Sequence, residues 1–117
     1  ALFGIGSLSA RLPSRVYSGG FLDPDEIAHA QEDGVVGDVC TVLLREDGST
    51  DMDLNKRASG PSPATLRKIP RRLAVVAGAS KALPLLGALH AGVITDLVLD
   101  DGAARELLDL VRHRTHA

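Results

Sequence analysis

The chain has 117 residues, 44% of them hydrophobic and 24% charged, which is typical of one small globular domain. A formal net charge of −2 argues against a free-standing DNA-binding domain, and 3% aromatic residues are too few to stack the bases of a single-stranded nucleic acid. With one cysteine, no suitably spaced histidines, no membrane-length apolar run and no signal peptide, we expect a cytoplasmic protein without a disulfide, a metal ion or a cofactor.

The first predicted element is a strand that breaks into a turn within residues 1–7. Its first three residues are apolar and lack an initial Met, so we interpret them as the end of a buried strand in a longer protein. Residues 8–19 predict a loop. Asp23 and Pro24 are typical of the N-cap and first position of a short helix, which Gly34 is expected to end.

The middle of the chain predicts one strand, a turn and a second short helix. Residues 35–44 are rich in β-branched side chains, which favours a single strand, and Gly37 inside it indicates a bulge or the close approach of another group. The Asp47-Gly48 dipeptide is typical of a hairpin turn. Ser62 is expected to cap a helix of one or two turns that ends before the next proline.

Strands and helices alternate in the last third of the chain. Residues 73–78 form an apolar run typical of a parallel strand buried on both faces, and residues 93–99 predict its neighbour. A helix over residues 82–91 lies between them and ends at Gly92, and a final helix follows Asp100. This alternation predicts an α/β fold with a parallel sheet and a right-handed crossover. The core face of the last helix is expected to comprise Ala103, Ala104, Leu107, Leu108 and Val111.

Small or polar side chains follow three of the predicted strands, and ligands of open α/β sheets bind at the edge where the carboxyl ends of parallel strands meet. The three groups are Gly4, Gly6 and Ser7, then Gly78, Ser80 and Lys81, then Asp100 and Asp101. The turn over residues 78–81 opens a helix, so its backbone amides and Lys81 suit a phosphate or sugar phosphate. An ordinary strand-to-helix turn with an exposed lysine is the alternative.

Four further features each allow a functional and a structural interpretation. Asp38 lies in an apolar strand and either accepts hydrogen bonds from sugar hydroxyls or caps a local turn. Asp100 either does likewise or caps the last helix. The basic cluster of residues 67–72 is either a solvated surface or a contact for phosphate or a partner. Cys40 has no base nearby in the sequence, which favours a buried structural thiol over a reactive one.

Several short motifs occur in an order and spacing that point together to one family. They are Gly4-Ile5-Gly6-Ser7, Gly19-Gly20-Phe21-Leu22, Val36-Gly37-Asp38-Val39, Asp47-Gly48, Asn55-Lys56-Arg57, Leu66-Arg67-Lys68-Ile69-Pro70, Val75-Val76-Ala77-Gly78-Ala79-Ser80-Lys81 and Leu97-Val98-Leu99-Asp100-Asp101. With these motifs the chain resembles the C-terminal part of the sugar-binding domain of SorC-type bacterial transcriptional regulators, a group often filed with DeoR-like repressors.

The resemblance implies a Rossmann-like α/β fold akin to ribose-5-phosphate isomerase and glucosamine-6-phosphate deaminase. It implies a non-enzymatic domain that binds a phosphorylated sugar, and the sugar alters homo-oligomerisation and DNA binding. DNA would be bound by an N-terminal helix-turn-helix, which is absent here, as is the first half of the effector domain. No membrane partner is implied. The alternative is a fragment of a sugar-phosphate isomerase or deaminase, with Asp38 or Asp100 as the general base.

Carried over residue by residue, the resemblance implies six positions around the sugar: Gly6, Asp38, Asn55, Gly78, Lys81 and Asp100. Lys81 would contact phosphate or a sugar oxygen, and the two aspartates would accept hydrogen bonds from hydroxyls. The chain departs from the family pattern in two places. The second glycine of a Gly-Gly pair is Ala79 here, and a Thr-Asp-Glu motif is replaced by Leu99-Asp100-Asp101.

Overall fold

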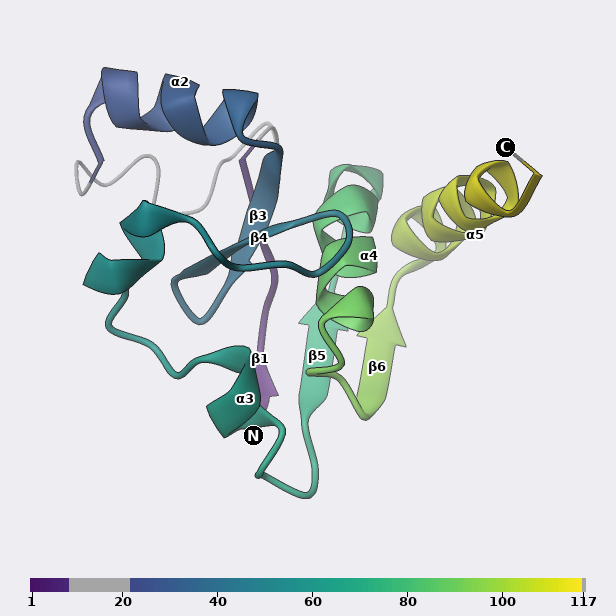
Figure 1. Ribbon diagram of the computed structural model, residues 1–117. Coiled ribbons are helices and arrows are strands. Elements are labelled where there is room, and N and C mark those ends of the chain that lie inside the picture. Colours follow the sequence, from purple (N-terminus) through teal and green to yellow (C-terminus); the bar gives the residue numbers. More distant parts are fainter. Residues whose placement is uncertain (9–21, 117) are drawn as a thin grey trace.

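The computed structural model describes residues 1–8 and 22–116. The chain forms two three-stranded sheets (Figure 1). Sheet A is parallel with the order β1-β5-β6, and its strands are Leu2–Phe3, Leu73–Val76 and Asp96–Leu99. Sheet B is antiparallel with the order β2-β3-β4, and its strands are Gly6–Ser7, Val35–Val39 and Val42–Arg45. Residues 9–19 of the predicted loop and residues 19–21 of the motif that ends at residue 22 fall outside the described residues.

Sheet A and its helices form the predicted α/β unit. Strand β5 leads through the one-turn 3-10 helix η2 (Ala79–Lys81) into α4 (Ala82–His90), and β6 leads into α5 (Asp101–His116). Gly92, with a φ of 72°, ends the α4 segment as predicted. The α/β fold with a parallel sheet is therefore confirmed, while the likeness to sugar-phosphate isomerases and deaminases stays a prediction.

Helix α4 holds the two sheets together in one core. Its Leu85 and Ala88 are fully buried in the cluster that also contains Ala74 of β5 and Leu44 of β4. Gly37 allows sheet B to approach this helix, because a Cβ there would lie 2.1 Å from the Gly6 carbonyl oxygen and 2.5 Å from Pro84 Cβ. The register of β3 and β4 also shifts just before Gly37. Both features expected of this glycine, a bulge and a close approach, are thus present.

The strand predicted over residues 35–44 is in fact a hairpin, so that prediction is wrong. The chain reverses at Cys40 and Thr41, whose φ angles are 49° and 72°. Neither residue type signals a left-handed turn, and for the β-branched threonine a positive φ is unusual. The hydroxyl of Thr41 accepts a hydrogen bond from the Gly60 amide at 3.0 Å, so a distant segment holds the turn.

The short helices begin where their capping residues predict. Helix α2 (Pro24–Glu32) has a capping box, in which Asp23 accepts from the Glu26 amide at 2.8 Å and the Glu26 side chain accepts from the Asp23 amide at 3.1 Å. Helix α3 (Pro63–Leu66) starts after Ser62, whose hydroxyl accepts from Thr65 N. The Asp47-Gly48 turn forms but no strand follows it; instead the chain enters the 3-10 helix η1 (Asp53–Arg57).

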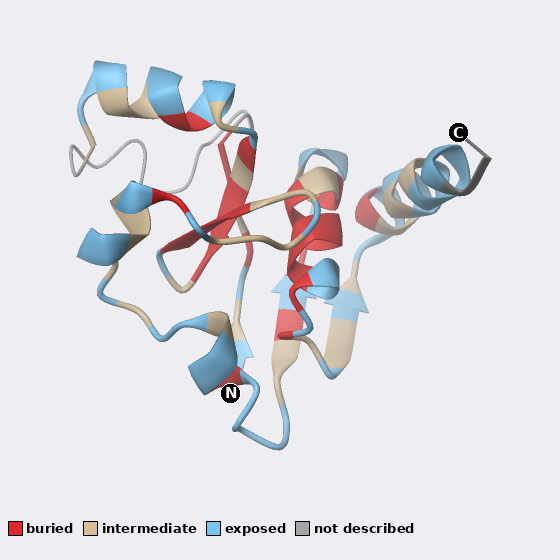
Figure 2. Cartoon of the chain, in the orientation of Figure 1, coloured by how far each residue is buried: buried red, intermediate tan, exposed pale blue. Residues whose placement is uncertain are grey.

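One face of sheet A is open, which corrects the expectation that its strands are buried on both faces. Leu2, Val75 and Val98 are 73%, 49% and 53% exposed, and Figure 2 shows exposed stretches in β1 and β6. Helix α5 likewise exposes side chains that were predicted to lie on its core face. Ala103 is buried and Leu107 packs against the core, but Leu108 and Val111 are exposed.

Among the described helices, none is long and apolar enough to cross a membrane.

Candidate functional site

The carboxyl ends of β5 and β6 meet the β1–β2 connection at one edge of the molecule. The Lys81 ammonium donates to the Ile5 carbonyl at 2.8 Å, and the Gly78 amide donates to Asp100 Oδ2 at 3.0 Å. The Ser7 hydroxyl donates to the Ser80 carbonyl at 3.4 Å. The three chain segments predicted to converge therefore do converge. One detail differs, because Gly6 and Ser7 belong to sheet B and not to a continuation of β1.

The turn between β5 and α4 has the features of an anion-binding loop. Gly78 has a φ of 98°, a conformation that favours glycine, and the Lys81 amide closes the turn on the Gly78 carbonyl at 3.1 Å. The amides of Ala79 and Ser80 have no acceptor within the described part of the chain. Two amides at the beginning of a helical segment, beside a lysine, can hold the oxygens of an anion.

Lys81 has donors left for a ligand. Its side chain is partly buried, and the Ile5 carbonyl takes one of the three N–H donors of the ammonium. Within residues 1–8 and 22–116 no other acceptor engages the ammonium, so its other two donors remain for ligand oxygens at the same edge. The contact with Ile5 also fixes where the positive charge lies, so the side chain loses less conformational entropy when a ligand binds.

Asp100 caps α5, which confirms the capping interpretation. Its Oδ1 accepts from the Ala103 amide at 2.9 Å while Oδ2 accepts from Gly78. These backbone hydrogen bonds, from Ala103 first and Gly78 second, hold the pKa of the Asp100 carboxyl below its ordinary value. Each oxygen keeps lone pairs that could accept from a sugar hydroxyl. The ligand role of Asp100 stays a prediction.

Gly6 and Asp38 lie opposite each other in the β2–β3 pair, and Asp38 is buried. Gly37 faces α4, so by the alternation of a strand the Asp38 side chain lies on the other face of sheet B, the face of its register partner Leu43. Burial, and then the charge of Asp38, raises the pKa of the Cys40 thiol. A thiol with a raised pKa is a poor nucleophile, in keeping with a structural role for Cys40.

Asn55, like the Asp38 side chain, is not brought together with Gly78, Lys81 and Asp100. Its Oδ1 accepts from the Leu43 amide at 2.7 Å, and its Nδ2 donates at 2.8 Å to the carbonyls of Leu43 and Thr50. This side chain thereby pairs with the outer edge of β4, two strands away from Gly6. Both amide hydrogens are used, so one lone pair on Oδ1 is left for any ligand. Its ligand role stays a prediction.

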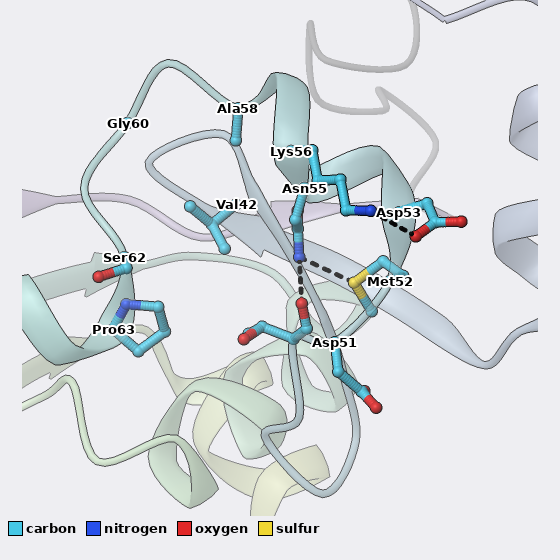
Figure 3. A pocket seen from close by; sticks show the side chains of 11 residues that line it. Val42, Asp51, Met52, Asp53, Asn55, Lys56, Ala58, Gly60, Ser62 and Pro63 are labelled. Atoms are coloured by element: carbon cyan, nitrogen blue, oxygen red, sulfur yellow. Dashed lines mark hydrogen bonds and ion pairs between the residues drawn. The ribbon is translucent and has the colours of Figure 1, made fainter.

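Asn55 lines a hollow of about 400 Å³ that the sequence did not indicate (Figure 3). Val42 and Met52 are buried side chains of its lining, and a surface ion pair of 3.3 Å between Lys56 and Asp53 lies at its rim. In the described residues, no group of three or more His, Cys, Asp or Glu side chains is placed to hold a metal ion.

The basic cluster of residues 67–72 has a structural role that neither of its interpretations included. Arg67 donates to the Ala91 carbonyl at 2.6 Å, and Arg72 donates to the carbonyls of Val93 and Ile69 at 3.0 and 2.6 Å. The Ala91 and Val93 carbonyls follow the C-terminal end of α4, where positive charge is also favourable to the helix dipole, whereas the Ile69 carbonyl precedes β5.

Comparison with known proteins decides the family. Residues 1–109 match the Sugar-bind family, described as a putative sugar-binding domain. The chain belongs to this family. It is 34% identical over 90 residues to the transcriptional regulator YjhU of Escherichia coli K12. The matched residues cover 76% of this chain and 27% of YjhU.

Solved structures agree with this assignment. A domain of a possible sugar-binding transcriptional regulator from Arthrobacter aurescens is 48% identical, with a TM-score of 0.82 over 92% of this chain and 41% of that one. The full-length sorbitol operon regulator SorC from Klebsiella pneumoniae is 28% identical, with a TM-score of 0.78 over 92% of this chain and 35% of SorC. The resemblance to SorC-type regulators is thereby confirmed. The chain spans less than half the length of each relative, and these relatives favour a regulator domain over a fragment of an enzyme.

Proposed function

We propose that the chain is the C-terminal portion of the effector-binding domain of a transcriptional regulator, and that its effector is a phosphorylated sugar. The observation that carries the proposal is the position of the Lys81 ammonium, beside the free amides of Ala79 and Ser80 and at the edge where Gly78 meets Asp100. Membership of the Sugar-bind family supports a sugar as the ligand class.

In this proposal the two kinds of polar group at the edge divide the ligand between them. Lys81 and the free amides take the anionic phosphate, because a charge-assisted hydrogen bond to a fixed donor is stronger than a neutral one. The carboxylate of Asp100 at this edge accepts hydrogen bonds from sugar hydroxyls.

The regulatory step would be a shift in population. A sugar phosphate that binds one assembly state of the regulator more tightly favours that state, and the affinity for DNA changes with it. Homo-oligomerisation and the DNA contact belong to the proposal, with DNA bound by a helix-turn-helix in another part of the regulator. The relatives named as transcriptional regulators support this role.

Isothermal titration with matched ligand pairs tests the proposal. We expect a panel of pentose and hexose phosphates, including ribose 5-phosphate and glucosamine 6-phosphate, to contain a ligand that binds roughly tenfold or more tightly than its unphosphorylated parent sugar. Equal affinity for each phosphate and its parent would contradict a phosphate site. Turnover of either named phosphate by the protein would establish the enzyme interpretation instead.

A further inference from the structure

The turn that carries Lys81 follows a strand of sheet A, yet its side-chain contacts reach the segment that enters sheet B. The Lys81 ammonium lies 2.8 Å from the Ile5 carbonyl oxygen, and the fully buried Ser7 hydroxyl lies 3.4 Å from the Ser80 carbonyl oxygen. Both contacts join residues more than 70 positions apart in the chain. The candidate ligand turn is therefore tethered from the side of sheet B.

Ile5 lies at the crossing between the two sheets. The chain leaves sheet A after β1 and enters sheet B at β2, with residues 4–5 as the whole connection. The Ile5 side chain is buried in the core that α4 shares with both sheets. Beyond the crossing, Gly6 pairs with Asp38, and the Leu8 amide donates to the Val36 carbonyl at 3.2 Å. A displacement of the Ile5 carbonyl would be passed directly to the β2–β3 pairing.

We infer that Lys81 couples ligand binding to the attachment of sheet B. The ammonium that takes the ligand's anionic group also fixes the crossing at Ile5, so an occupied site strengthens the β2–β3 pairing and an absent ammonium weakens it. Ser7 supports the same turn as a positioning residue. The ligand half of this inference rests on the proposed function, whereas the tether at Ile5 and Ser7 does not.

The physical basis of the coupling is linkage. The Ile5 carbonyl holds the Lys81 ammonium in one place, which raises the affinity of any anion that needs it there. Reciprocity then requires that a bound anion stabilise the arrangement in which Ile5 holds Lys81. The ammonium can serve both partners at once because it has three donors and Ile5 uses one. The segment expected to respond is the crossing with the two strands that it joins, β2 and β3.

Hydrogen exchange without any ligand tests the tether in the 117-residue chain. Lys81→Met keeps the length and the apolar stem of the side chain but removes the ammonium. We expect amide exchange in residues 5–8 and 35–39 to become roughly tenfold faster or more, since a hydrogen bond from a charged group is lost. Ser7→Ala should accelerate the same residues to a smaller extent. Lys68→Met, which removes an exposed lysine far from the crossing, is the matched control.

The pattern of exchange separates the tether from general destabilisation. Exchange that rises in residues 5–8 and 35–39 while residues 103–110 of α5 keep their wild-type rate supports the tether. An unchanged rate at the crossing in Lys81→Met, or a uniform rise along the chain, overturns it. Lys81→Arg, which restores a charged donor, should recover part of the protection.

A second exchange measurement, with ribose 5-phosphate or glucosamine 6-phosphate added, tests the coupling. A phosphate that gives a binding heat and slows exchange in residues 5–8 and 35–39 of the wild type, but not of Lys81→Met, supports it. A phosphate that binds with a clear heat and leaves this exchange unchanged overturns it. If no sugar phosphate binds the wild type, the proposed function fails, and the ligand-free measurement still decides whether the tether exists.

Discussion

Single polar side chains at the carboxyl edge hold backbone groups of distant segments in place. Asp100 joins the end of β5 to the start of α5 through the amides of Gly78 and Ala103, and Lys81 joins the same turn to Ile5. Charged side chains that already make fixed hydrogen bonds present a rigid surface to a ligand. Sequence alone placed Lys81, Gly78 and Asp100 together, because the ends of parallel strands share one edge.

The double hydrogen bonding of Asp100 predicts a pH-dependent contribution to stability. Because folding lowers the pKa of this carboxyl, its contribution to the free energy of unfolding is present above about pH 4 and is lost as the pH falls through the folded pKa. We therefore expect Asp100→Ala to destabilise the chain at neutral pH and the difference from wild type to shrink on acidification. Urea denaturation at a series of pH values measures this difference.

The matched control for this change is Asp109→Ala, an exposed carboxylate on the same helix. Its effect on the free energy of unfolding should be small at every pH tested. A difference between wild type and Asp100→Ala that is as large at pH 3 as at pH 7 would show that the charge of Asp100 does not contribute as described.

At the scale of elements, local signals located the helix ends and failed at the hairpin. Asp23 before Pro24, and Ser62 before a proline, satisfy orphan amides within one turn, so the sequence carries all that is needed. The turn at Cys40 and Thr41 has no such local cause. It is held by the Gly60 amide, and a contact between residues 19 positions apart leaves no mark on sequence periodicity.

The periodicity of apolar residues also did not predict which side of the last helix faces the core. Leu107 and Leu108 both belong to the apolar stripe, yet Leu107 packs on the core and Leu108 is 53% exposed. We expect Leu107→Asp to reduce the free energy of unfolding by about 2 kcal/mol and Leu108→Asp to change it by less than about 0.5 kcal/mol. Paired urea denaturation curves test this order, and a larger loss in Leu108→Asp would reverse our placement of the helix face.

The packing of sheet B on α4 depends on the absence of a side chain at Gly37. A Cβ there would lie 2.1 Å from the Gly6 carbonyl oxygen, whereas a Cβ on Gly4 would find its nearest neighbour, the Val75 carbonyl oxygen, at 3.9 Å. Gly37→Ala should therefore cost about 2 kcal/mol or more in the free energy of unfolding, and Gly4→Ala should be close to neutral. Equal stability of the two variants would contradict the close approach.

For the whole molecule, the central feature is that two sheets meet at the predicted ligand edge. The sequence indicated the parallel sheet and its edge, but the pattern of residues 1–7 predicted one strand followed by a turn. In the structure this segment contains two strands, β1 and β2. The division of that segment between two sheets depends on pairing with β3 and β5, which are distant in the chain. Burial on both faces of sheet A was wrongly expected, since an apolar run such as residues 73–78 cannot show which of its faces is covered.

Asn55 shows that the position of a candidate site residue also cannot be predicted from a sequence motif alone. A motif can carry a residue into a predicted ligand set, but this amide is engaged with the edge of β4, and only the folded arrangement reveals that. The open face of sheet A, with Val75 and Val98, and the exposed stripe of α5 are likewise visible only in the folded arrangement.

The most direct test of the central claim is calorimetric titration of one tight-binding sugar phosphate into wild type, Lys81→Met and Lys68→Met. Both variants remove one positive charge with the same substitution, so they share any change in overall electrostatics. The account predicts that Lys81→Met weakens binding roughly tenfold or more, the loss expected for a charge-assisted hydrogen bond, while Lys68→Met binds as wild type does. Wild-type affinity in a folded Lys81→Met protein would contradict the placement of the phosphate at this edge.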